Sequence, residues 1–181
     1  MPAETPQGGD DVVELFTFRI GGEDYALDIR RVREIVNPQP ITPVPRAPVF
    51  VEGVIRLRGD VLPVISVRKR FGLPVPPVGA KSKFLVVQVA GRRVALVVDQ
   101  VAEVLRVHRS EIRPAPTIPA GQATPRFFLG VSGGEDASGF GRRPTAPGRI
   151  RLLLNVKALL EPEAPGERAA ARAQAEATRH A

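Results

Sequence analysis

The feature of this sequence that most constrains its fold is an internal repeat. Residues 22–36, GEDYALDIRRVREIV, align without a gap with residues 91–105, GRRVALVVDQVAEVL, at an offset of 69. After insertions, two further blocks keep the same order: 50–54 with 127–131, and 59–69 with 148–158. Three ordered blocks indicate two copies of one small structural unit, at about 14–75 and 82–160.

Each copy has the pattern of short strands joined by tight turns. In the first copy, LFTFRI places Phe16, Phe18 and Ile20 on one face of a strand, and the following GGED is typical of a hairpin turn. A second hairpin is expected across Arg58–Gly59, and RKRFGL (68–73) is expected to form a short helix that ends at a glycine. We therefore predict an all-β protein built of two tandem SH3-like five-stranded barrels with short helices.

The sequence outside these units lacks apolar periodicity. Residues 1–13 are expected to be disordered, and 161–181 to be a flexible tail that is disordered or partly helical. Residues 132–148 contain five glycines and two prolines, which favours a long mobile loop. The N-terminal residues lack the apolar stretch of a signal peptide, and the chain has no apolar run of transmembrane length, so we expect a cytoplasmic protein.

The composition argues against an enzyme. The chain has no cysteine and two histidines, and no set of metal ligands or of catalytic groups stands out. His108 lies in LRVHRSEI and is interpreted as a surface histidine at a strand end. We expect no catalytic residue, no metal, no cofactor and no small-molecule substrate.

The charge distribution leaves one alternative to a protein partner. The net charge is +7, and because both ends are acidic the segment 14–160 carries +11. Such a body favours an acidic protein surface or nucleic acid as its partner. Nucleic-acid binding by a small barrel also needs exposed stacking aromatics, and five of the eight phenylalanines occupy positions of the core pattern: 16, 18, 50, 71 and 84. A basic nucleic-acid-binding barrel is therefore the less favoured alternative.

Four stretches of the sequence resemble the CheW family of chemotaxis coupling proteins. They are FRIGGEDYALDIRRVREIV, ITPVPRAPVFVEGVIRLRGDVLPVISVRKRFGL, VAGRRVALVVDQVAEVL and EIRPAP. The resemblance covers most of 16–160 and implies the same pair of SH3-like barrels. It also implies a non-catalytic adaptor that links the cytoplasmic tips of chemoreceptors to the regulatory domain of the histidine kinase CheA. Contact with the membrane would then be indirect, through receptors in arrays.

The resemblance also implies a receptor-binding and kinase-binding site. The family's groove maps onto Val32, Glu34, Gly53, Arg58, Gly59 and Phe84. Within it, a guanidinium at a tight turn offers a planar fork of donors to a carboxylate, for which Glu34 or a receptor carboxylate is expected. Asp99 is expected to be structural. Arg56 and Ser66 depart from the family's usual Asn and Asp, and both changes make this region more basic.

Overall fold

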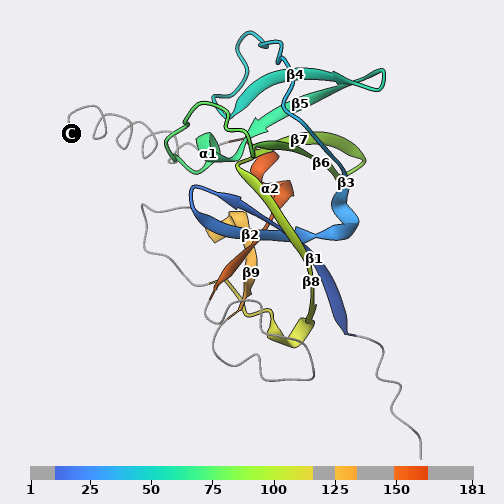
Figure 1. The fold of residues 1–181 in the computed structure, drawn as a ribbon, viewed down its shortest axis with the longest axis vertical. Coiled ribbons are helices and arrows are strands. Elements are labelled where there is room, and N and C mark those ends of the chain that lie inside the picture. The colour runs from blue at the N-terminus through green and yellow to red at the C-terminus, as the bar shows by residue number, and fades with distance from the viewer. Residues whose placement is uncertain (1–10, 116–124, 134–148, 163–181) are drawn as a thin grey trace, which may run out of the picture.

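The computed structural model describes residues 11–115, 125–133 and 149–162, and these residues are mostly β-structure (Figure 1). The strands are β1 (Val12–Ile20), β2 (Glu23–Asp28), β3 (Val32–Val36), β4 (Val51–Leu57), β5 (Asp60–Ser66), β6 (Lys83–Val89), β7 (Arg92–Val98), β8 (Gln100–His108), β9 (Phe128–Ser132) and β10 (Arg151–Leu154). Two short α-helices are α1 (Val67–Arg70) and α2 (Val156–Leu160), and three 3-10 turns are η1 (Ile29–Arg31), η2 (Arg109–Glu111) and η3 (Pro125–Phe127). The all-β prediction is confirmed.

The strands form two five-stranded sheets that lie one above the other in Figure 1. Barrel A has the strand order β8-β1-β2-β10-β9, and barrel B has the order β3-β6-β7-β5-β4. When each strand is replaced by its repeat equivalent, the two orders become identical. Even the single parallel pair of each barrel is equivalent, β10 with β2 and β5 with β7. The internal repeat is therefore a repeat of structure.

The barrels do not follow the predicted boundaries of 14–75 and 82–160. Barrel A combines β1 and β2 of the first copy with β8, β9 and β10 of the second, and barrel B takes the remaining strands. The chain leaves barrel A after β2, builds barrel B and then returns. Because the equivalent strands share one pattern, the same pairings form whichever copy supplies them. Val12 and Val13, expected in a disordered N-terminus, are the first residues of β1.

The equivalent helices begin with equivalent caps. The side chain of Ser66 accepts a hydrogen bond from the backbone N–H of Lys69, and Asn155 does the same for Ala158. Such caps satisfy amide groups that lack a partner within the helix. Ser66 therefore has a structural role in α1, and the expected end of this helix near Gly72 is confirmed, since α1 stops at Arg70 and Gly72 has φ +67°.

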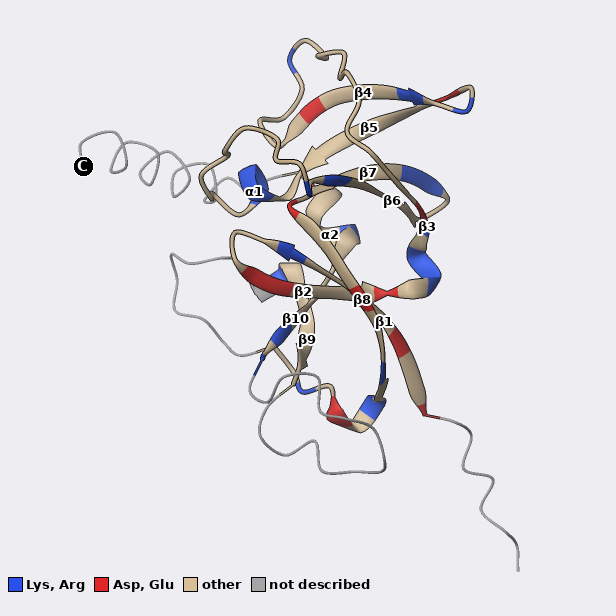
Figure 2. Ribbon diagram, viewed as in Figure 1, with Lys and Arg blue, Asp and Glu red and all other residues tan. Residues whose placement is uncertain are grey.

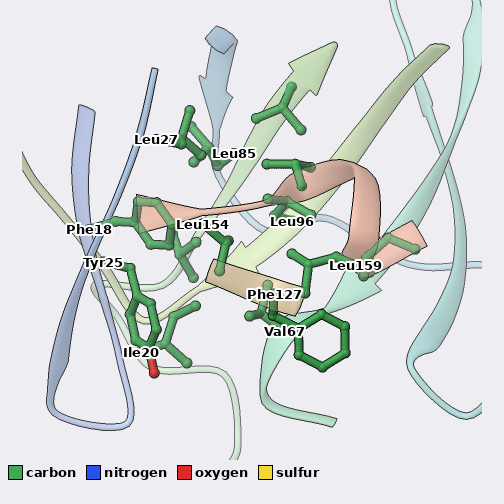
Figure 3. Packing of buried hydrophobic residues seen from close by; sticks show 14 of the residues in the cluster. Phe18, Ile20, Tyr25, Leu27, Val67, Leu85, Leu96, Phe127, Leu154 and Leu159 are labelled. Carbon is green, nitrogen blue, oxygen red and sulfur yellow. The ribbon is translucent and has the colours of Figure 1, made fainter. Parts of the chain in front are cut away.

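Three apolar clusters hold this arrangement together. The main cluster lies between the barrels, where Phe18 and Leu27 of barrel A meet Leu85 and Leu96 of barrel B (Figure 3). A second cluster inside barrel B contains Ile55, Leu62, Val64, Phe84, Val86 and Ala95, and a third inside barrel A contains Leu15, Ala26 and Leu153. The main cluster draws on both copies of the repeat, so the two barrels share one core.

Tyr25 belongs to this shared core, and the buried Arg70 packs against two of its phenylalanines. Burial raises the pKa of Tyr25 to about 12, with a smaller contribution from Glu23. The Arg70 guanidinium lies 4.3 Å from the ring centroid of Phe50 and 4.9 Å from that of Phe127, a cation–π arrangement. Because Phe50 precedes β4 and Phe127 precedes β9, Arg70 connects the two copies of the repeat.

Candidate protein-binding site at the β4–β5 hairpin

The hairpin between β4 and β5 turns on two residues, Arg58 and Gly59. Both have positive φ, +50° and +88°, as the favoured two-residue hairpin turns require. The predicted need for glycine at position 59 is confirmed. Positive φ at Arg58 costs a non-glycine residue about 1 kcal/mol, and a strained position of this kind often accompanies a functional side chain.

Arg58 reaches from this turn to β3. Its Nη2 lies 3.2 Å from Oε2 of Glu34, and the two side chains are 78% and 21% exposed. The ion pair predicted from the sequence is therefore present. An exposed pair contributes less than about 1 kcal/mol to stability, so its main consequence is orientation: the guanidinium is held at the surface beside β3.

Two further contacts surround this pair. Arg93 at the start of β7 forms an ion pair with Asp60, the residue that follows the turn. Arg33 of β3 donates a hydrogen bond of 2.6 Å to the side chain of Gln88 in β6, and Gln88 is the register partner of Arg93. Arg93 was not among the residues predicted for the site, because its approach to the hairpin depends on the pairing of β7 with β5 and β6.

The remaining predicted residues divide by burial. Val32 begins β3, is half-buried and packs against the main core. Phe84 is 1% exposed inside barrel B, opposite Val36 of β3. The Phe84 side chain was expected to contact a partner, but it is too deeply buried to do so. It packs inside barrel B, where Val36 of β3 lies against the same cluster.

Gly53 is also buried, within β4. A Cβ at this position would lie 2.2 Å from the carbonyl oxygen of Thr42, and φ is +145°. Thr42 exchanges two backbone hydrogen bonds with Val54, so Gly53 admits the close approach of that segment. Gly53 was expected to lie in the binding surface, but it is buried and its role is structural. The equivalent Gly130 admits Arg113 in the same way.

Other features of the described residues bear on chemistry. His108 is exposed at the end of β8, as expected. Within the described ranges, no three or more histidine or acidic side chains come close enough to hold a metal ion. No helix in this part of the chain is long and apolar enough to cross a membrane. Most of the predicted loop at 132–148 lies outside the described residues.

Comparison with known proteins identifies the family to which this fold and hairpin belong. Residues 14–164 match the family model of the CheW-like domain. The chain belongs to the CheW-like family. This assignment confirms the resemblance seen in the sequence, and it favours a chemotaxis scaffold over the nucleic-acid-binding alternative.

Individual relatives agree. Chemotaxis protein CheW of Rhizobium meliloti (strain 1021) is 41% identical over 105 residues, which cover 58% of this chain and 68% of that protein. Chemotaxis protein CheW of Klebsiella aerogenes is 31% identical over 151 residues, covering 83% and 82%. Protein FrzA of Myxococcus xanthus is 34% identical over 128 residues, covering 68% and 78%.

A solved structure supports the fold directly. The scaffolding protein TtCheW from Thermoanaerobacter tengcongensis superposes with a TM-score of 0.71 at 27% sequence identity. The match covers 89% of this chain and 96% of that one. The prediction of two SH3-like barrels is confirmed at the level of architecture.

Proposed function

We propose that this CheW-like protein is a non-catalytic adaptor that couples the cytoplasmic tips of chemoreceptors to the histidine kinase CheA. Membership of the CheW-like family over 14–164 is the observation that carries the proposal. The adaptor works in the cytoplasm and joins membrane-associated arrays through its receptors. It serves chemotaxis or another motility pathway.

The proposed contact surface is the part of the predicted site that is exposed. Arg58 and Gly59 form the tip of the hairpin, and Glu34 with the half-buried Val32 forms the adjoining edge of β3. A fork of guanidinium donors at this tip suits a carboxylate of the partner. Phe84 and Gly53 act beneath the surface, by supporting β3 and β4.

A co-sedimentation experiment tests the proposal. Receptor cytoplasmic fragments and CheA from the same genome are mixed with the full chain at near-physiological salt, and the ternary pellet is compared for wild type and Arg58→Glu. Arg106→Glu is the matched control, because Arg106 is similarly exposed at 70% and forms its ion pair with Glu14 on barrel A. Circular dichroism verifies that each variant folds.

We expect wild type and the control to form the pellet, and Arg58→Glu to lose it. A pellet that is equally strong with Arg58→Glu would refute the assignment of the site. Absence of binding to either protein, together with salt-sensitive retention of nucleic acid, would support the basic-barrel alternative instead.

A further inference from the structure

Six arginines lie on the segments around the Arg58–Glu34 pair, and we call them the arginine band (Figure 2). The band comprises Arg31, Arg33, Arg56, Arg58, Arg92 and Arg93. In Figure 2 the basic segments beside β3, at the start of β7 and at the β4–β5 hairpin lie along the same edge of barrel B. These segments are far apart in the sequence, so the band exists only in the folded protein.

A series of contacts connects three members of the band, Arg33, Arg93 and Arg58. Arg33 bonds to Gln88, which pairs in register with Arg93, and Arg93 forms its ion pair with Asp60. Asp60 follows the turn that carries Arg58, and Arg58 returns to Glu34, the neighbour of Arg33. Arg56 and Arg92 lie on the same two hairpins, one on β4 opposite Val61 and one at the start of β7.

The band has more positive charge than the fold neutralises. It contains six arginines and two carboxylates, Glu34 and Asp60, which leaves a net charge of +4. Among the described residues, Arg31, Arg56 and Arg92 form no ion pair and are exposed. Elsewhere on the described surface, some exposed arginines, such as Arg30, Arg106 and Arg109, have a carboxylate partner. Other exposed basic residues there form no ion pair with a described residue: Arg46, Lys81, Arg113 and Lys157. The band differs in that three such arginines lie on neighbouring segments beside the proposed receptor site (Figure 2).

Two exposed apolar side chains lie next to members of the band, one on the same strand as Arg33 and one opposite Arg56. Ile35 of β3 is 42% exposed and Val61 of β5 is 61% exposed. An apolar centre with a charged rim is the usual composition of a protein-binding surface. The rim here has one dominant sign, which selects the sign of the partner.

We propose that this surface selects receptor tips that carry a cluster of carboxylates, and that Arg56 and Arg92 determine this selectivity. The inference rests on the proposed function, since it specifies which receptors the same site accepts. The Arg58–Glu34 pair positions the hairpin, while the arginines without an intramolecular partner supply long-range attraction to acidic side chains of the receptor. A partner tip with lysines at those places is rejected by like charge.

Charge at the rim of an interface acts on association more than on packing. It raises the association rate and makes affinity depend on salt. A neutral docking surface of the same shape would bind with little salt dependence. A charged surface is therefore distinguished from a neutral one by the salt dependence of its affinity, and by the loss of that dependence when the rim charge is removed.

The test is a fluorescence-anisotropy titration of labelled receptor cytoplasmic fragments from the same genome with the full chain. It compares wild type, Arg56→Glu/Arg92→Glu and the control Arg106→Glu from about 50 to about 300 mM salt. We expect the wild-type affinity to fall about tenfold across this range, and the double variant to bind about tenfold more weakly at low salt with a much flatter dependence. The control should stay within about twofold of wild type.

A reciprocal change locates the partner's charge. Receptor fragments whose clustered tip carboxylates are changed to glutamine should bind the wild-type protein about tenfold more weakly at low salt. The same change should reduce their affinity for the double variant very little. Tight binding that neither salt nor the double variant alters overturns the inference and leaves the adaptor function standing. Failure of wild type to bind any receptor fragment at any salt contradicts the adaptor function itself, and the inference is then overturned with it.

Discussion

At position 53 the backbone itself requires glycine. The Gly53 φ of +145° is unfavourable for any residue with a Cβ, and such a Cβ would meet the Thr42 backbone. Gly59, at the exposed hairpin tip, also has positive φ, but no atom lies within 4 Å of its would-be Cβ. A Cβ at position 53 would therefore cause both backbone strain and a steric clash, whereas a Cβ at position 59 would cause backbone strain alone.

We expect Gly53→Ala to lower the free energy of unfolding by about 3 kcal/mol or more, because a backbone carbonyl cannot yield as a side chain does. Gly59→Ala should cost about 1 kcal/mol, the strain of positive φ alone. Urea denaturation followed by circular dichroism measures both. Equal costs for the two variants would contradict the close approach of Thr42 to β4.

Individual contacts differ in how far the sequence predicts them. Glu34 was one of the two partners expected for Arg58, because the family resemblance placed both residues in one groove, and the structure contains this pair. Phe84 was not placed correctly as a contact residue, because alternation along β6 does not show which face lies inside a barrel. Its neighbours Leu85 and Val86 are buried too, so β6 has no exposed face on which a pattern would appear.

At the scale of elements, Asp99 joins three segments. Its carboxylate accepts two hydrogen bonds from Arg68 of α1, at 3.0 and 2.6 Å, and one from the backbone N–H of Gly21 in the β1–β2 turn. Asp99 itself lies between β7 and β8. Its expected structural role is confirmed, although the Arg68 partner could not be read from the sequence because 31 positions separate the two residues.

The pKa of Asp99 follows from these contacts. Partial burial alone would raise this pKa, but the hydrogen bonds from Arg68 and Gly21 outweigh burial and lower it below its usual value. A carboxyl group whose pKa is lower in the folded state stabilises the fold above its unfolded pKa of about 3.9. That stabilisation is lost as the pH falls through the lower, folded pKa.

We expect Asp99→Asn to reduce the free energy of unfolding by about 1–2 kcal/mol at neutral pH, because two charge-assisted hydrogen bonds are weakened. The difference from wild type should begin to shrink below about pH 4, the unfolded pKa, and should vanish only below the lower, folded pKa, where Asp99 is protonated and nearly isosteric with asparagine. Urea denaturation at neutral pH and at acidic pH measures this convergence. A difference that persists undiminished in acid would show that charge is not the source of the stabilisation.

At the scale of the whole molecule, the exchange of strands between the barrels is the property that the sequence did not predict. The repeat predicted the number, order and equivalence of the strands, and the family model and TtCheW agree with that architecture. Local patterns specify which strand types pair, such as β5 with β7 and β10 with β2. They do not specify which copy supplies them, because both choices bury the same faces.

The exchange makes each half of the chain dependent on the other. Residues 1–77 contain β1 to β5 without β6, β7, β8 or β10, so each of their two hairpins, β1–β2 and β4–β5, lacks its neighbouring strands. Isolated two-stranded hairpins are marginally stable in water. Residues 78–181 lack β2 and β5, the strands on which β10 and β7 form their parallel pairs.

We therefore expect fragments 1–77 and 78–181 to lack native β-structure when separate, and to form a one-to-one complex with native circular dichroism when mixed. The shared core between the barrels would drive this association, so Phe18→Asp in the first fragment should abolish it, since Phe18 is 0% exposed in that core. Circular dichroism and size-exclusion chromatography measure both effects. Independent folding of either fragment would mean that the copies close barrels of their own, along the boundaries that the sequence repeat suggests, and that exchange is not required for the fold.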